Sequence, residues 1–382
     1  MILAIVFLVF VSLFIYSYLI YPSSLHYLGN KTIGTHTSGK RPIVVLLAAY
    51  NEENHISKTI QAIFNSNNLD NIEMVIVADD GSEDETMKVL QNLQIQYSKL
   101  KVERLHRIGK PQALNFLVEK FQLNTDSYHI LLMDANIALD TNCIIELEKE
   151  ILIDKVGMVG ASVVPLQNQR NVESDYVLRE NRIKLEESRT MGYAIGVFGA
   201  CYMMRGELYQ RIPKNFITDD LFLTFSVIGK NYYVLYSQTA IAKEHISAVL
   251  TNEFKRKSRY AAGNFQILFH FLDLLNPWKT SFGFIYAFFF HKILRWLSPI
   301  LFLVAWILSF FNLFGQYSNI LIYGGSLVCL FLFFNYLLTL LKINAIWYRM
   351  YYFLSMNLAI LYGFFNYIKG IKTNVWERSD RI

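Results

Sequence analysis

The central part of the chain alternates continuous apolar runs with stretches in which apolar residues recur at helical spacing. Short apolar runs bounded by polar residues predict buried strands, and they occur at 41–50, 72–78, 102–105 and 128–133. Apolar residues at helical spacing predict intervening helices at about 56–64, 87–93, 111–122 and 141–152. This alternation predicts an α/β fold, with a mostly parallel sheet and helices on both of its faces.

Longer apolar segments flank this region. Residues 1–25 and 297–341 contain no Asp, Glu, Lys or Arg. Because about 20 apolar residues span a bilayer as a helix, we expect an N-terminal transmembrane anchor at 1–25. We expect about three membrane segments within 297–370, the last of which can span or re-enter. A cleaved signal peptide is the alternative for the first segment, but a basic start and a small-residue cleavage site are missing.

Basic residues next to these apolar segments indicate an orientation. Lys31, Lys40 and Arg41 follow the first segment, so the positive-inside rule predicts a cytoplasmic domain at 40–245. Three further crossings then put the C-terminus outside, whereas the basic tail at 371–382 favours the inside. The side on which the tail lies stays open.

The segment 246–296 mixes aromatic and basic residues. Lys255, Arg256, Lys257 and Arg259 occur among phenylalanines and leucines, and basic residues interrupt 281–296 in the same way. Such patterns are typical of amphipathic helices that lie in the membrane interface. We therefore expect 246–296 to form interface helices that contact membrane lipids.

Composition and charge exclude several classes of protein. Hydrophobic residues make up 53% of the 382 residues and charged residues 18%, which excludes a disordered chain or a fibre. The net charge of +5 comes largely from basic residues beside apolar segments, which indicates lipid headgroups and argues against a nucleic acid partner. Cys143, Cys201 and Cys329 are widely separated, so they suggest neither a disulfide framework nor a zinc site and fit a reducing compartment.

Polar side chains follow three of the predicted strands. They are Tyr50 to Glu52, Asp79 with Asp80, and Asp134 with Asn136. In a parallel sheet the ligand binds beyond the carboxyl ends of the strands, and crowded carboxylates there need a cation or a donor-rich ligand. Hard oxygen ligands favour Mg or Mn, with a nucleotide diphosphate completing the shell. The glycine patterns of a dinucleotide fold and of a P-loop are missing.

Each motif taken alone also fits a structural role. Asp79 to Ser82 fits an acidic turn, and Asp134 to Asn136 fits a helix cap region. Thr218 to Asp220 fits the N-terminus of a helix that begins near Leu221. The order and spacing of these motifs are more informative than any one of them.

Seven segments, in order, resemble the motifs of the membrane-associated family 2 glycosyltransferases. That family includes the synthases of poly-N-acetylglucosamine, hyaluronan and cellulose, and the ceramide glucosyltransferases. The resemblance covers about 40–270. The matching segments are 49–53 (AYNEE), 79–82 (DDGS), 109–115 (GKPQALN), 134–136 (DAN), 199–201 (GAC, followed by Arg205), 218–221 (TDDL) and 256–260 (RKSRY).

The resemblance implies a GT-A-type (Rossmann-like) domain that transfers a sugar with inversion from a nucleotide-sugar, expected to be a UDP-sugar. It implies that Asp220 is the catalytic base and that Asp134 and Asn136 hold the metal. It further implies donor-binding roles for Tyr50, Glu52, Asp79, Asp80, Lys110 and Asp134, and diphosphate or acceptor roles for Asp219, Cys201, Arg256, Arg259 and Tyr260.

The chain departs from the family pattern at three motifs. Asn136 replaces the second Asp of DxD, which removes one negative charge from the metal site. Asp219 replaces the Glu of TED. Arg256 and Tyr260 replace the Gln and Trp of QxxRW, and Arg at the first of these positions occurs in the lipid-glucosylating branch of the family.

The leading hypothesis is a multi-pass polysaccharide synthase of the bacterial inner membrane that uses a UDP-sugar. The alternative is a transferase that adds one sugar to a lipid, which the short membrane region and Arg256 favour. A non-catalytic subunit or a transporter is a different class. The chain has no internal repeat and retains both Asp134 and Asp220, which argues against that class.

Overall fold

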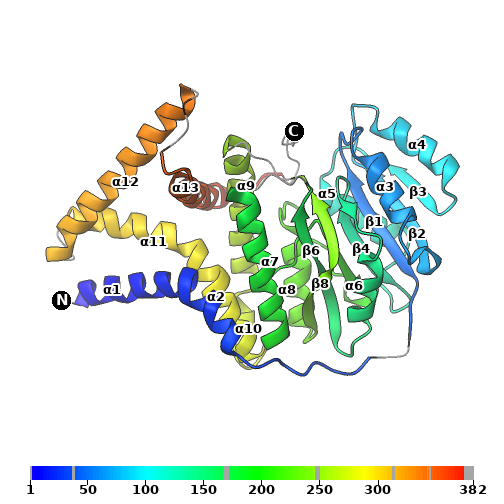
Figure 1. The fold of residues 1–382 in the computed structure, drawn as a ribbon, viewed down its shortest axis with the longest axis horizontal. Coiled ribbons are helices and arrows are strands. Elements are labelled where there is room, and N and C mark those ends of the chain that lie inside the picture. The colour runs from blue at the N-terminus through cyan, green and yellow to red at the C-terminus, as the bar shows by residue number, and fades with distance from the viewer. Residues whose placement is uncertain are drawn as a thin grey trace. The chain divides into compact units, whose positions relative to one another are not determined.

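The computed structural model describes residues 2–36, 39–166, 172–245, 250–311, 315–341, 343 and 346–373 (Figure 1). The chain divides into two compact units. The helical unit comprises Met1–Tyr27, Val249–Leu268 and Tyr286–Gly370. The sheet unit comprises Leu28–Ala248, Phe269–Ile285 and Ile371–Ile382.

The sheet unit is built around one eight-stranded sheet in the order β3-β2-β1-β4-β7-β6-β8-β5. The strands β3, β2, β1 and β4 are parallel, whereas β7 runs antiparallel to both β4 and β6. The strands are β1 (Ile43–Ala49), β2 (Ile72–Asp79), β3 (Leu100–Arg104), β4 (His129–Asp134), β5 (Ala138–Leu139), β6 (Val156–Pro165), β7 (Cys201–Arg205) and β8 (Tyr233–Glu244). The four strands predicted from the sequence are β1 to β4, and the predicted α/β fold is confirmed.

Six helices of the sheet unit connect these strands. The predicted helices at 56–64, 87–93, 111–122 and 141–152 are confirmed within a few residues at each end, and α8 begins two residues before the expected Leu221. The six helices are α3 (Ile56–Phe64), α4 (Thr86–Gln96), α5 (Lys110–Lys120), α6 (Cys143–Ile151), α7 (Val172–Met191) and α8 (Asp219–Gly229).

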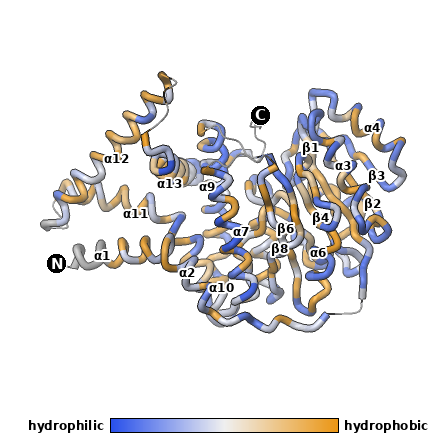
Figure 2. Tube along the Cα trace, in the orientation of Figure 1, coloured by the Kyte–Doolittle hydropathy of each residue, from blue (hydrophilic) through white to orange (hydrophobic). Residues whose placement is uncertain are grey.

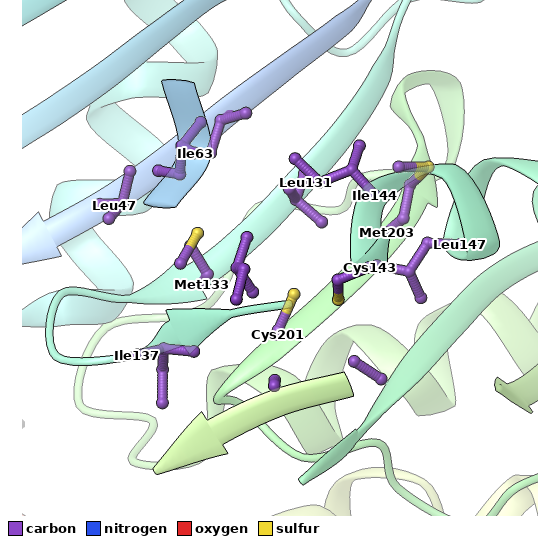
Figure 3. Close-up of a cluster of buried hydrophobic side chains, with 14 of the residues drawn as sticks. Leu47, Ile63, Leu131, Met133, Ile137, Cys143, Ile144, Leu147, Cys201 and Met203 are labelled. Atoms are coloured by element: carbon purple, nitrogen blue, oxygen red, sulfur yellow. The ribbon is translucent and has the colours of Figure 1, made fainter. Parts of the chain in front are cut away.

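The hydrophobic core lies between the sheet and the helices α3, α4 and α6. Successive side chains of a strand point to opposite faces, and in β1 the side chains of Ile43, Val45 and Leu47 belong to this core. Val44 and Leu46 point to the other face and are equally buried, which explains why β1 is a continuous apolar run. Each such side chain contributes roughly 1.5–3 kcal/mol of transfer free energy. Figure 3 shows part of the core, where Leu131, Met133 and Ile144 lie together.

The registers of the parallel strands place polar residues at one edge of the sheet. Ala49 pairs with Asp79 across β1 and β2, and Ala48 pairs with Asp134 across β1 and β4. The predicted convergence of the three strand ends is therefore confirmed. Tyr50 follows Ala49 directly, so it starts from this same edge.

Within the described residues, three helical stretches are long and apolar enough to cross a membrane. They are Val9–Tyr27, Phe282–Ser309 and Tyr317–Leu340, and Figure 2 shows that α12 is hydrophobic along most of its length. The helices concerned are α1 (Ile2–Ile15), α2 (Tyr21–Ser24), α10 (Phe282–Ala287), α11 (Leu294–Ser309) and α12 (Gln316–Leu340). The first stretch overlaps the expected anchor at 1–25.

The boundary expected between 296 and 297 falls inside a continuous helix. We expected 281–296 to be a separate interface helix, but Phe282–Ser309 is helical throughout. The basic residues do not interrupt it, because the guanidinium of Arg295 donates to the Ser17 carbonyl at 3.0 Å and His291 is fully buried. Sequence alone did not reveal that these polar groups face other helices.

Two further helices of the helical unit pack closely against each other. They are α9 (Leu250–His270) and α13 (Tyr348–Ile368), and Phe265 and Phe364 meet at 5.0 Å between ring centroids. A Cβ atom at Gly363 would collide with the carbonyl of Ser258, so glycine permits the close approach. Of the expected basic tail at 371–382, residues 374–382 lie outside the described part of the chain.

Candidate active site

Lys110 links the polar edge of the sheet to the start of α8. It is the first residue of α5, preceded by Gly109 with a φ of 87°, a conformation that favours glycine. Its Nζ lies 2.7 Å from Oδ1 of Asp134 and 3.2 Å from Oδ2 of Asp219. Burial by itself lowers the pKa of Lys110, but the two carboxylates outweigh it and raise that pKa above its ordinary value. The ammonium is therefore held charged between two elements.

Asp80 fixes the loop that leads into Lys110. Its carboxylate pairs with Arg107 at 2.6 Å and accepts hydrogen bonds from the backbone N–H groups of Ile108 and Gly109 at 2.7 and 2.9 Å. Asp80 is only 2% exposed, and a buried carboxylate is stabilised by such donors. Because both oxygens are used inside the protein, Asp80 acts on the loop, and through it on the position of Lys110.

Tyr50 and Asp79 lie next to this loop. The guanidinium carbon of Arg107 is 3.3 Å from the centroid of the Tyr50 ring, a cation–π contact. Asp79 is fully buried. Its Oδ1 accepts the Ser82 N–H at 3.3 Å, while Oδ2 has no hydrogen-bond partner in the described part of the chain. A buried carboxylate oxygen without a partner is costly, which makes Asp79 a candidate acceptor for a ligand N–H or O–H.

The first turn of α8 carries two adjacent carboxylates, on Asp219 and Asp220. Acidic residues at a helix N-terminus are favoured by the helix dipole, so the position of these two carboxylates at the start of α8 stabilises their negative charge. Oδ1 of Asp220 accepts the Leu221 N–H at 2.8 Å. Burial and the neighbouring Asp219 raise the pKa of Asp220 to about 6, against the lowering effect of Lys110 and of the Leu221 N–H. A carboxyl group that titrates near neutral pH is suited to proton transfer.

Gly199 adjoins the second oxygen of Asp220. A Cβ atom at Gly199 would lie 3.2 Å from Oδ2, which is a tight contact. Glycine at this position therefore leaves space beside the carboxylate oxygen that the Leu221 N–H does not occupy.

The donor set suits a divalent cation bound together with phosphate. Within the described residues, no three His, Cys, Asp or Glu side chains lie close enough to hold a metal by themselves. Asp134 ends β4 and Asn136 follows it in a turn, so two hard oxygen ligands are present. Magnesium is usually held by one or two carboxylates, with substrate phosphates and water completing its shell. The residues therefore fit a Mg²⁺ or Mn²⁺ ion that arrives with a diphosphate.

The side chain of Cys201 lies in the hydrophobic core, and its expected acceptor role stays a prediction. Cys201 is the first residue of β7 and is fully buried. Figure 3 shows its sulfur among core side chains beside Cys143. The hydrogen bond with Cys143, and then burial, raise the pKa of the Cys201 thiol. The side chain points to the core because of the alternation along β7.

Arg256, Arg259 and Tyr260 lie on α9, in the helical unit. Arg256 pairs with Glu253 one turn away at 2.7 Å. The guanidinium of Arg259 lies 5.0 Å from the centroid of the Tyr260 ring. Their expected diphosphate and acceptor roles stay predictions, as does the expected donor contact of Glu52, whose backbone N–H donates to Thr86 at 2.7 Å.

Sequence reasoning missed Arg107 and Lys184. Arg107 holds Tyr50 and Asp80, and Lys184 is a buried lysine whose charge acts on Asp220. Arg107 stands two residues before the GK motif, but nothing in the local pattern separates it from a solvated arginine. Lys184 lies in a polar stretch, so its burial was not predictable.

Comparison with known proteins identifies the family. Residues 41–263, more than half of the chain, match the Glycosyltransferase like family 2. The chain is 26% identical over 248 residues to the beta-monoglucosyldiacylglycerol synthases of Trichormus variabilis and of a Nostoc species, covering 62% of this chain and 52% of each relative. The chain thus spans about half the length of these relatives.

A solved structure with a similar fold covers nearly the whole chain. It is a mannosyltransferase of Pyrobaculum calidifontis in complex with GDP-mannose and Mn²⁺, with a TM-score of 0.69 and 15% identity over 96% of this chain and 99% of the other. At that identity the likeness shows a shared fold. Together with the family match, it establishes that the chain belongs to the family 2 glycosyltransferases, with a GT-A-like fold.

Proposed function

We propose that this glycosyltransferase moves one hexose from a UDP-sugar to a lipid acceptor of the diacylglycerol class, with inversion at the anomeric carbon. The observation that carries the proposal is the pairing of Lys110 with Asp134 and Asp219 next to the carboxylate of Asp220. The similarity to two glucosyldiacylglycerol synthases supports a lipid acceptor. This similarity favours a lipid acceptor over the growing polysaccharide of the leading hypothesis from the sequence.

The donor is bound at the polar edge of the sheet. The Asp79 oxygen that has no partner among the described residues accepts an N–H of the base, and the Tyr50 ring with Arg107 forms a flat surface for the nucleoside. Lys110 carries the charge that neutralises the diphosphate leaving group as the glycosidic bond breaks. Asp134 and Asn136 would hold Mg²⁺ or Mn²⁺, which supplies further neutralisation of the diphosphate when bound.

Asp220 acts as the base on the acceptor. Its Oδ2, beside Gly199, accepts the proton of the acceptor hydroxyl while that oxygen attacks the anomeric carbon. The diphosphate leaves from the opposite side of the ring, so one displacement inverts the configuration. With a pKa of about 6, the carboxylate is ionised at neutral pH and ready to take the proton.

We further propose a multi-pass protein of the bacterial inner membrane. Three helical stretches have the length and hydropathy for crossing, and a lipid acceptor is itself a membrane component. The sheet unit then faces the cytoplasm, where nucleotide-sugars are available, in agreement with the basic residues after the first stretch.

The test is a product analysis. The purified protein in lipid nanodiscs that contain diacylglycerol is incubated with labelled UDP-glucose, other UDP-hexoses or GDP-mannose, with Mg²⁺ or Mn²⁺. The proposal expects a lipid that carries one sugar, and Asp220→Asn as a matched control that forms none. A polymer would support the polysaccharide alternative, and release of nucleotide without any glycosylated product would reject both acceptors.

A further inference from the structure

α7 carries a buried lysine that the proposed chemistry does not use. Lys184 is 4% exposed, although lysine is rarely buried without a compensating contact. Its Nζ lies 3.5 Å from the centroid of the Phe198 ring, well within the range of a cation–π interaction, which is stronger when desolvated. Lys184 therefore holds one face of Phe198.

The same helix holds the loop that contains Phe198. This loop, Gly192–Gly199, forms all but the last residue of the connection between α7 and β7, and Gly192 and Gly196 have φ values of 80° and 83°. Oε2 of Glu187 accepts the N–H of Ile195 at 3.1 Å. Because Lys184 and Glu187 are three residues apart, they lie on one face of α7, and both contact the Gly192–Gly199 loop.

The end of this loop adjoins Asp220. Phe198 is followed by Gly199, whose Cβ position lies 3.2 Å from Oδ2 of Asp220, and Oδ1 is occupied by the Leu221 N–H. A shift of Phe198 therefore moves the backbone that borders the oxygen left for the acceptor. The contacts run without a gap from Lys184 through Phe198 and Gly199 to Asp220.

We propose that Lys184 is a positioning residue for sugar transfer: by holding Phe198 it fixes Gly199 beside Oδ2 of Asp220 and keeps the path of the acceptor hydroxyl open. The inference rests on the proposed function and assigns this residue no contact with substrate. The positive charge of Lys184 also supports the role of Asp220 as a base. Three charged groups affect the carboxyl of Asp220: Asp219 raises its pKa, whereas Lys110 and Lys184 lower it. Lys184 thus also favours the ionised base.

The experiment compares two variants of Lys184 in the full-length protein. Lys184→Met keeps the length of the side chain and removes the charge, and Lys184→Arg keeps a cation that stacks on an aromatic ring. Arg182→Met is the control, because Arg182 is an exposed basic residue on the same helix. Initial rates with labelled UDP-glucose and diacylglycerol, the calorimetric affinity for UDP with Mn²⁺, and the thermal unfolding midpoint are measured for each.

We expect Lys184→Met to lower kcat by on the order of 10- to 100-fold, the cost of misplacing a catalytic group by about 1 Å, with UDP affinity unchanged. Lys184→Arg should restore most of the rate, and Arg182→Met should match the wild type.

A wild-type kcat in Lys184→Met would overturn the assignment, as would equal losses in both Lys184 variants. A parallel loss of UDP affinity and unfolding midpoint would reveal a merely structural residue. If the wild type transfers no sugar at all, the proposed function itself is rejected. That result differs from a failure of the Lys184 assignment, in which the wild type transfers sugar and Lys184→Met transfers it equally well.

Discussion

The ammonium of Lys110 lies 2.7 Å from the carboxylate of Asp134, which joins the start of α5 to the end of β4. The same ammonium lies 3.2 Å from Asp219 at the start of α8. One cation thus brings together three elements that are far apart in the sequence. In the mechanism that we propose, this point is where the leaving diphosphate and the acceptor meet.

Lys110→Met should weaken UDP binding. The variant removes the cation that faces the diphosphate and leaves Asp134 and Asp219 to repel each other and the phosphates. Hydrogen bonds to charged groups contribute roughly 1.5–3 kcal/mol, so we expect UDP affinity to fall on the order of 10- to 100-fold by calorimetry. Lys120→Met is the matched control, because Lys120 ends the same helix and pairs with Glu103 away from the site. Equal affinities for wild type and Lys110→Met would contradict the assignment.

Asp220→Asn should abolish transfer and spare donor binding. The amide cannot accept the acceptor proton, and loss of a general base costs on the order of 10²- to 10⁴-fold in rate. UDP affinity should stay at the wild-type value, since the base faces the acceptor. Asp126→Asn, at an exposed position, controls for the loss of a carboxylate. Normal turnover by Asp220→Asn would remove Asp220 from the mechanism.

The rate should depend on pH through the carboxyl of Asp220. Burial and Asp219 raise its pKa to about 6, and the base works only when ionised. We therefore expect kcat to fall as the pH drops through about 6, by tenfold for each further unit once below that pKa. The profile should be flat from about pH 7 upward until other groups titrate. A rate that rises on acidification would contradict a carboxylate base.

Removal of divalent metal should weaken donor binding through Asp134. In EDTA the wild type should lose transfer, and Mn²⁺ or Mg²⁺ should restore it, because the cation neutralises the diphosphate. Asp134→Ala should bind UDP with the same low affinity in EDTA and in Mn²⁺. An unchanged rate of transfer in EDTA, or an increase of UDP affinity on addition of metal to Asp134→Ala, would exclude a metal site at Asp134.

Asp80→Ala should destabilise the loop before α5. The variant removes the ion pair with Arg107 and leaves the Ile108 and Gly109 N–H groups without their acceptor. Leaving such buried groups unsatisfied costs roughly 1–3 kcal/mol, so the urea midpoint should fall and UDP affinity should decrease with it. Glu83→Ala, an exposed neighbour, should change neither. An unchanged urea midpoint in Asp80→Ala would show that the contacts of Asp80 do not stabilise the loop.

The two central strands of the parallel half of the sheet, β1 and β4, were predictable because they are buried on both faces. β1 and β4 are uninterrupted apolar runs, and the polar residues that end them share one edge for purely topological reasons. The other half of the sheet, which is mixed, gave no such signal, since glycines interrupt β6 where other elements pack closely. A Cβ atom at Gly160 would come within 2.8 Å of Val197, so tertiary packing selects glycine against its weak strand preference.

Sequence patterns located site residues without showing which way each side chain points. Cys201 stands in a matching motif, yet the period of β7 turns it into the core. The donor-binding role expected for Asp80 stays a prediction, and in the structure its oxygens accept from the Arg107–Gly109 loop. Lys184 was missed because a lysine inside a polar helix gives no sign of burial. Such details depend on contacts between residues distant in the chain.

The most direct test of the central claim is the anomeric configuration of the product formed by the wild type. The glycolipid made from UDP-glucose and diacylglycerol would be isolated, and the coupling constant of its anomeric proton measured by NMR. Direct displacement with Asp220 as the base predicts a single β-linked sugar from the α-linked donor. An α-linked sugar, or no sugar on the lipid with any UDP- or GDP-sugar, would contradict this account.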